Sequence, residues 1–285
     1  MNKILLLIVS FLIILSPLFG QKKTDEPNLK KGIKTETVLK YGYEDKFGKY
    51  EEVLEDKFIY QYDFNGNKVE YLRYDSTGSL SWRYIYKYEL NENIFIESTH
   101  KTDGSLLSKT IKKNNSNRKI VEKSEFDSKE FLKKRFIYQY DSKGDLIDES
   151  WYQSDGLLKW KTVYWYDSNK NMVKEELYKS DGLLYVYVFY KYDSNNNVVE
   201  MSWHDSEGNL NDRSRGYCIF IYKYGFNENK LEEIRYDSEN NLKEKIIFNY
   251  NMNRLTEEIK YEYTFKFGKL QEIPKRKYIY EYMEY

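Results

Sequence analysis

The stretch from Lys57 to Glu89 reads KFIYQYDFNGNKVEYLRYDSTGSLSWRYIYKYE. Tyrosine or another large apolar residue occupies alternate positions over long parts of it. Two polar runs, D-F-N-G from Asp63 and D-S-T-G from Asp75, interrupt this alternation. Alternation predicts β-strands with one buried face, and Asp or Asn followed by a late glycine predicts tight turns. The stretch therefore predicts a β-hairpin module and the start of the next one.

The module recurs every 26 residues along the chain. Two series of residues have this spacing. One consists of large apolar residues three places before the second tyrosine of Y-x-Y, and the other consists of leucines that follow the second turn of each module. Such a fixed spacing is the signature of an internal repeat. The first series is Ile59, Ile85, Ile111, Ile137, Val163 and Phe189, and the second is Leu80, Leu106, Leu132, Leu158, Leu184 and Leu210. Six residues are inserted around Asn211–Gly216 before the repeat resumes.

About eight modules predict an all-β fold of roughly sixteen strands. Sheets of more than about 10 strands curl or split because their twist accumulates. We therefore expect a long antiparallel β-meander that curls into a spiral, a shell or an open barrel. A two-sided β-solenoid with one module per coil is the alternative.

The two ends of the repeat region match each other. KFGKYEEVLEDKFIYQY from Lys46 aligns without gaps with KFGKLQEIPKRKYIYEY from Lys266. Terminal repeats of linear arrays are often variants that cap the array. We therefore expect one β-repeat domain over residues 33–285, with capping units at 33–62 and 261–285.

Residues 1–20 have the features of a secretory signal peptide. Lys3 supplies a positive start, an apolar run follows from Ile4 to Phe19, and Gly20 precedes the expected cleavage at Gln21. Residues 21–32 then form a leader segment. No cysteine lies near the cleavage point, so we expect no lipid anchor. This end predicts an exported protein in the periplasm, on the cell surface or secreted, and not a lipoprotein.

Charge and cysteine content exclude several classes of protein. The chain has 46 basic and 46 acidic residues and no basic patch, so neither nucleic acid nor an anionic membrane is an expected partner. Charged residues between the tyrosine positions argue against a membrane-spanning barrel, and we expect no membrane span once the signal is cleaved. Examples are Lys133, Arg135, Lys159 and Lys161. The single Cys218 excludes an intramolecular disulfide.

The runs YQYDFNGNKVE and YDSTGSL resemble those of the YD-repeat or RHS-repeat family over roughly residues 33–285. Long members of that family wind strands into hollow shells around toxins, or bind sugars and proteins at cell surfaces. The resemblance thus implies a β-repeat scaffold that binds a ligand or belongs to a toxin-related system. The SDGLL turns are also similar to MORN-like variant repeats, a second family of non-catalytic scaffolds.

No catalytic motif stands out in the sequence. His100 and His204 occupy a ladder position that is aromatic in other modules, and Cys218 occupies a tryptophan position. We therefore expect a non-catalytic protein with no cofactor and no metal site. Two readings stay open: a pair of convergent carboxylates in a pocket would indicate glycoside hydrolysis, and the runs from Asp63 to Glu70 and from Asp193 to Glu200 resemble calcium loops as well as plain turns.

Three tryptophans lie off the main tyrosine ladder and are the candidate ligand-binding residues: Trp151, Trp203 and Trp165. Trp151 and Trp203 share one repeat position. Tryptophan flanked by Asp, Asn and Lys offers a sugar an apolar ring face and hydrogen-bonding groups, so we predict a polysaccharide ligand. The alternatives are that these rings cover the second face of the sheet, or that the protein binds another envelope or surface protein through its unpaired edge strands.

Overall fold

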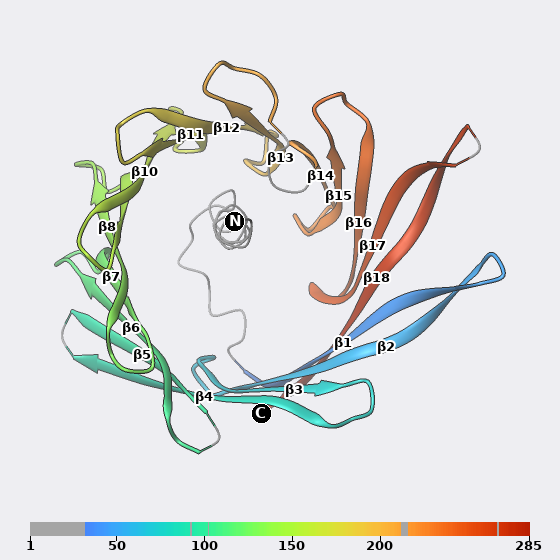
Figure 1. Cartoon of the computed structure of the whole chain (residues 1–285), viewed down its shortest axis with the longest axis horizontal. Helices are drawn as coiled ribbons and strands as arrows, with labels where there is room; N and C mark the ends of the chain where they lie inside the picture. The colour runs from blue at the N-terminus through green and yellow to red at the C-terminus, as the bar shows by residue number, and fades with distance from the viewer. Residues whose placement is uncertain (1–31, 92, 102, 212–215, 267) are drawn as a thin grey trace. The chain divides into compact units, whose positions relative to one another are not determined.

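The computed structural model describes residues 32–91, 93–101, 103–211, 216–266 and 268–285, and every helix or strand element in this part of the chain is a β-strand (Figure 1). The predicted all-β class is therefore confirmed. The strands are β1 (Ile33–Lys46), β2 (Lys49–Tyr62), β3 (Lys68–Asp75), β4 (Leu80–Asn91), β5 (Ile94–His100), β6 (Leu106–Asn114), β7 (Ile120–Phe126), β8 (Leu132–Tyr140), β9 (Leu146–Gln153), β10 (Leu158–Tyr166), β11 (Met172–Lys179), β12 (Leu184–Tyr192), β13 (Val198–Asp205), β14 (Ile219–Tyr224), β15 (Lys230–Tyr236), β16 (Leu242–Asn251), β17 (Arg254–Lys266) and β18 (Lys269–Glu284).

The turns between strands form as the repeat predicts. In the first turn, the amide of Gly66 donates to the carbonyl of Asp63 at 2.9 Å, and the Asp63 carboxylate accepts from the amide of Asn67 at 2.8 Å. Gly66 has a positive φ of 83°, which glycine adopts without steric cost. The same two contacts, from the amides three and four places after an aspartate, recur at Asp141 and Asp193.

The expectation of an open meander or a solenoid is wrong, because the strand order is closed. Strands that follow one another in the chain are neighbours in the sheet, and β1 pairs with β18 as well as with β2, which is the strand order of a β-barrel. The amide of Tyr285 donates to the carbonyl of Gly32 at 3.2 Å, and Lys277 forms an ion pair with Glu52 at 3.0 Å. In an open meander, the outer edges of β1 and β18 would have unpaired amides and carbonyls. Pairing between these two strands satisfies those groups.

The strands form two compact units. The first comprises Tyr164–Glu176 and Leu184–Arg276, and the second comprises residues 32–163, Leu177–Leu183 and Lys277–Tyr285.

In the first unit the two faces of the sheet differ in chemistry. Val188 and Tyr190 of β12 are 2% and 5% exposed, whereas Phe189 between them is 41% exposed. We call the face of Val188 and Tyr190, with the equivalent positions of other modules, the tyrosine face. The opposite face carries cross-strand ion pairs such as Lys191–Glu200 at 2.7 Å, and we call it the ion-pair face.

In the second unit the tyrosine face holds a ladder of stacked rings. Tyr60 and Tyr71 have ring centroids 5.2 Å apart, and Tyr71 and Tyr84 are 5.7 Å apart with nearly parallel planes. Such cross-strand aromatic pairs each contribute about 0.2–1 kcal/mol beyond an alanine pair. The predicted tyrosine ladder is therefore confirmed here.

Candidate functional site

An aromatic groove lies in the second unit, lined from β1, β2, β18 and the start of β3. Its volume is about 430 Å³, within the range of small-molecule sites. On the three longer strands the lining residues alternate along the chain, so their side chains share one face of the sheet. They are Glu36, Val38, Phe58, Tyr60, Tyr62, Lys68, Tyr278 and Tyr280. We call this site the β1–β18 groove.

Two charged side chains stand among the aromatic rings of the groove. Glu36 is 7% exposed and accepts a hydrogen bond from the Tyr62 hydroxyl at 2.7 Å. The Lys68 ammonium lies 4.5 Å from the centroid of the Tyr60 ring. Burial raises the pKa of Tyr60 to about 12. Burial and then the Glu36 carboxylate raise the pKa of Tyr62 as well, so both phenols are neutral hydrogen-bonding groups at neutral pH.

This combination suits a ligand with an apolar face and a polar rim. Aromatic rings bind apolar C–H surfaces, while hydroxyls, a carboxylate and an ammonium provide directed hydrogen bonds. Among the eight lining residues only Glu36 has a carboxyl group. The groove thus has one of the two carboxylates that glycoside hydrolysis requires.

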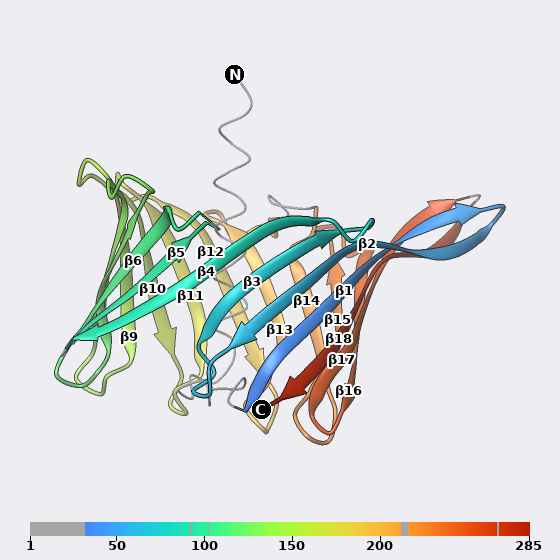
Figure 2. The same cartoon turned by 90° about the horizontal axis from the view of Figure 1, so that it is seen from below.

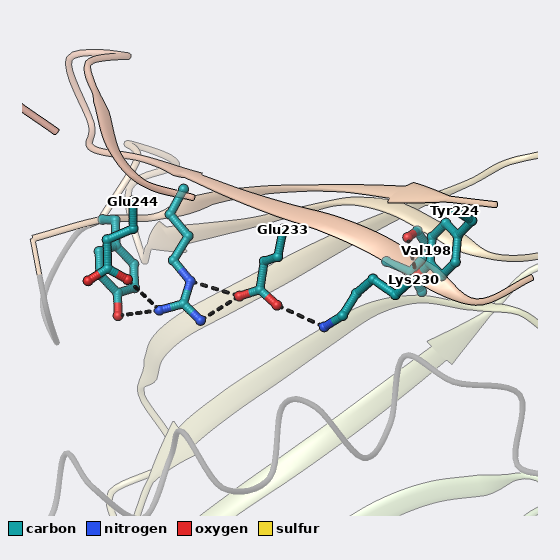
Figure 3. Close-up of polar contacts among 7 residues, drawn as sticks. Val198, Tyr224, Lys230, Glu233 and Glu244 are labelled. Atoms are coloured by element: carbon teal, nitrogen blue, oxygen red, sulfur yellow. Dashed lines mark hydrogen bonds and ion pairs between the residues drawn. The ribbon is translucent and has the colours of Figure 1, made fainter. Parts of the chain in front are cut away.

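A second polar cluster lies on the tyrosine face of the first unit (Figure 3). The guanidinium of Arg235 contacts Glu244 at 2.7 Å through Nη1 and Glu233 at 2.7 Å through Nε. Lys230 lies 2.9 Å from the other oxygen of Glu233, and Lys260 lies 2.6 Å from Glu244. Each carboxylate is therefore held by two cations.

The pKa shifts in this cluster follow from its closed set of partners. Burial disfavours the charged form of Glu233, but Lys230 and Arg235 outweigh it and hold the pKa of Glu233 below its ordinary value. Burial likewise opposes the charge on Arg235, and Glu233 keeps its pKa above the usual value. Because the charges of this cluster are paired with one another, it is not our candidate ligand site.

The structure does not bring the candidate tryptophans Trp165 and Trp203 to one face. The Trp165 indole donates to Glu176 at 3.0 Å, whereas the adjacent Glu175 accepts from Tyr190 on the tyrosine face at 2.7 Å. Glu176 and Trp165 therefore lie on the ion-pair face. Trp203 is opposite Val188 in the β12–β13 register and lies on the tyrosine face.

Trp151 belongs to the second unit and packs within the ladder. Its ring stacks on Phe136 with centroids 6.2 Å apart, and the Lys134 ammonium lies 5.3 Å from its ring centroid. It does not line the β1–β18 groove. The contacts of Trp151 match the alternative that these rings cover a face of the sheet.

The two histidines and the cysteine have structural surroundings. His100 contacts Ser98 Oγ at 2.9 Å and the carbonyl of Gly104 at 3.2 Å, which ties the strand end to the turn. His204 makes the same two contacts four modules further on. Cys218 is fully buried.

The carboxylates of the turns with calcium-loop character are engaged within their own turns. Asp63 and Asp193 accept from the backbone amide and from the side-chain amide of the asparagine four residues later. Within the described ranges, no group of three or more His, Cys, Asp or Glu residues is placed to hold a metal ion. Nor does this part of the chain contain a helix long and apolar enough to cross a membrane.

Comparison with known proteins shows no family and gives distant structural similarities. Neither a family model nor a curated protein sequence matches the chain. A porin-like protein from Bacteroides uniformis is 12% identical, with a TM-score of 0.47 over 87% of this chain and 97% of that one. A chain of the Photorhabdus luminescens Tc holotoxin pore is 11% identical, with a TM-score of 0.22 over 78% of this chain and 15% of that one. A DUF1329 family protein from Desulfovibrio piger is 8% identical, with a TM-score of 0.25 over 87% and 84%.

Proposed function

We propose that this chain is an exported, non-catalytic binding protein whose β1–β18 groove binds a carbohydrate. The observation that carries the proposal is the combination of five aromatic rings with Glu36 and Lys68 in one groove of about 430 Å³. Sugar rings have apolar C–H faces and equatorial hydroxyls, which this lining complements.

The chemistry of the groove supports binding rather than catalysis. Glycosidases place two carboxyl groups on either side of the scissile bond, about 5–5.5 Å apart for retention and about 6.5–9.5 Å apart for inversion. Glu36 is the single carboxyl group of the lining and already accepts the Tyr62 hydroxyl. A sugar that binds in the groove would therefore be released with its glycosidic bonds intact.

Two features support an exported protein that does not span a membrane. Residues 1–20 have the composition of a signal peptide, although they lie outside the described residues. The ion-pair face carries strongly exposed lysines, among them Lys191 at 68% and Lys223 at 59%. Charges at such positions are costly in a hydrocarbon environment.

Binding of the mature chain to a glycan array, compared with that of two variants, tests the proposal. The two variants carry the same substitution at equivalent repeat positions, one inside the groove and one outside it. Tyr60→Leu removes an aromatic ring from the groove but keeps an apolar side chain. Tyr138→Leu makes the same change at the equivalent repeat position on β8, outside the groove. We expect the first variant to lose at least tenfold in affinity and the second to bind as the parent chain does. Equal binding by the two folded variants would refute the groove as the site, and so would binding of no carbohydrate by the parent.

A further inference from the structure

The two end hairpins share a scaffold and differ in charge. The aligned residues 46–57 contain three basic and four acidic residues, whereas residues 266–277 contain five basic and one acidic. Glu51 corresponds to Gln271, and Glu55 corresponds to Lys275. We call residues 41–55 the acidic hairpin and residues 261–276 the basic hairpin.

The acidic hairpin extends past the rest of its unit (Figure 2). The register between β2 and β3 begins at Asp56, so residues 49–55 have no partner on the β3 side. Tyr50 and Val53 are each 37% exposed there. In the basic hairpin, which belongs to the other unit, Phe265 is 67% and Leu270 45% exposed. Each hairpin therefore offers apolar surface among charges of one prevailing sign.

Two features of the acidic hairpin oppose its own stability. Phe47 is fully exposed at the tip and has a positive φ of 56°, which is uncommon for a bulky side chain. Glu44 lies directly opposite Glu51, and like charges in facing positions repel, an effect that the contact of Lys46 with Glu51 at 2.7 Å offsets in part. A cationic partner with an apolar contact surface would relieve the repulsion and cover the exposed ring.

From this complementarity we infer that the acidic hairpin of one copy docks on the basic hairpin of a second copy. The contact is head-to-tail, because the two surfaces differ, and repeated contacts would build chains or rings. Screening by salt weakens the association, since the hairpin charges are exposed. The inference is independent of carbohydrate binding, which uses other residues.

A charge swap tests this inference. Glu51→Lys with Glu55→Lys gives a chain whose two hairpins are both basic, and Lys275→Glu with Arg276→Glu gives a chain whose hairpins are both acidic. By analytical ultracentrifugation we expect the parent chain to associate with rising concentration and each variant alone to remain monomeric. An equimolar mixture of the two variants should form heterodimers. The control Glu207→Lys with Glu239→Lys makes the same charge change at exposed turns and should associate as the parent does.

A second variant separates docking from folding. Phe47→Asn places Asn-Gly at the two central positions of the hairpin turn, where both residues have positive φ and where Asn-Gly is favoured. We expect Phe47→Asn to keep or raise the melting temperature while it weakens association. A parent chain that stays monomeric at all concentrations and salt levels, or a variant mixture that forms no heterodimer, would overturn the inference.

Discussion

The hydroxyl of Tyr224 donates a hydrogen bond to the backbone carbonyl of Val198 at 2.9 Å (Figure 3). The second tyrosine of Y-x-Y makes the same contact in other modules: Tyr88 to Lys68, Tyr140 to Ile120, and Tyr192 to Met172, at 2.6–2.8 Å. A register irregularity precedes this position in β14, between Lys223 and Tyr224. The tyrosine thus fastens an irregular strand end to the strand before it, which explains why the motif ends in tyrosine.

Tyr224→Phe removes only the hydroxyl of this contact. Because the Val198 carbonyl then loses a neutral hydrogen bond, we expect the free energy of unfolding to fall by about 1 kcal/mol in urea denaturation. Tyr236→Phe, which removes a hydroxyl from the partner strand β15, is the matched control. An equal effect of both changes would contradict a special role for this position.

Asn114 interrupts the tyrosine series in β6. Its Oδ1 atom is buried and has no hydrogen-bond partner among the described residues. Asn114→Tyr restores the aromatic ring and places a hydroxyl near the carbonyl of Ile94, the residue 20 places earlier. We expect a gain of about 1 kcal/mol in unfolding free energy. Asn114→Phe should gain less, and a loss of stability with tyrosine would show that the site cannot accept the ring.

Glu175 and Glu233 occupy the same repeat position, but we expect their contributions to stability to change in opposite directions with pH. Burial raises the pKa of Glu175, and the hydroxyl of Tyr190 offsets this only in part. The folded state therefore favours its protonated form, and stability is lost as pH rises above the unfolded value of about 4.3. We expect Glu175→Gln to raise the melting temperature at pH 7 and to leave it unchanged at pH 4.

Glu233 has a lowered pKa because its cation partners outweigh burial. Its contribution to stability is present above the unfolded value and is lost as pH falls through the folded pKa. Glu233→Gln leaves Arg235 and Lys230 partly unpaired, and we expect a loss of about 3–5 kcal/mol at pH 7 that shrinks in acid. Melting curves of both variants at pH 4 and 7 test this pair, and shifts of the same sign would contradict it.

The sequence predicts the local structure well because local structure depends on the repeat. The alternation in residues 57–89 and the Asp-to-Gly turns predict strands and hairpins that the structure contains. Closure depends instead on pairing between Gly32 and Tyr285, at opposite ends of the described chain. A 26-residue period describes neighbouring modules and carries no information on whether the first and last strands meet.

The repeat pattern does not predict the β1–β18 groove for the same reason, although one feature of the sequence indicates it. The gapless match between the two ends places Phe58 and Tyr60 at the same repeat positions as Tyr278 and Tyr280. All four line the groove once β18 pairs with β1. The tryptophan positions predict a different site, but the structure places Trp165 and Trp203 on opposite faces of the sheet.

The double variant Trp151→Ala, Trp203→Ala separates the groove from the tryptophan sites. Neither residue lines the β1–β18 groove, so we expect carbohydrate affinity to stay within about twofold of the parent value in isothermal titration. Stability should fall, because the stacking of Trp151 on Phe136 is lost. Loss of binding in a variant that remains folded would return the site to the tryptophans.

A crystal structure of the mature chain with the oligosaccharide selected on the glycan array tests the central claim most directly. The account predicts a sugar ring stacked on Tyr60 or Tyr280, with a hydroxyl hydrogen-bonded to Glu36. Sugar bound at another surface, or a groove that stays empty at a saturating concentration of that oligosaccharide, would contradict it.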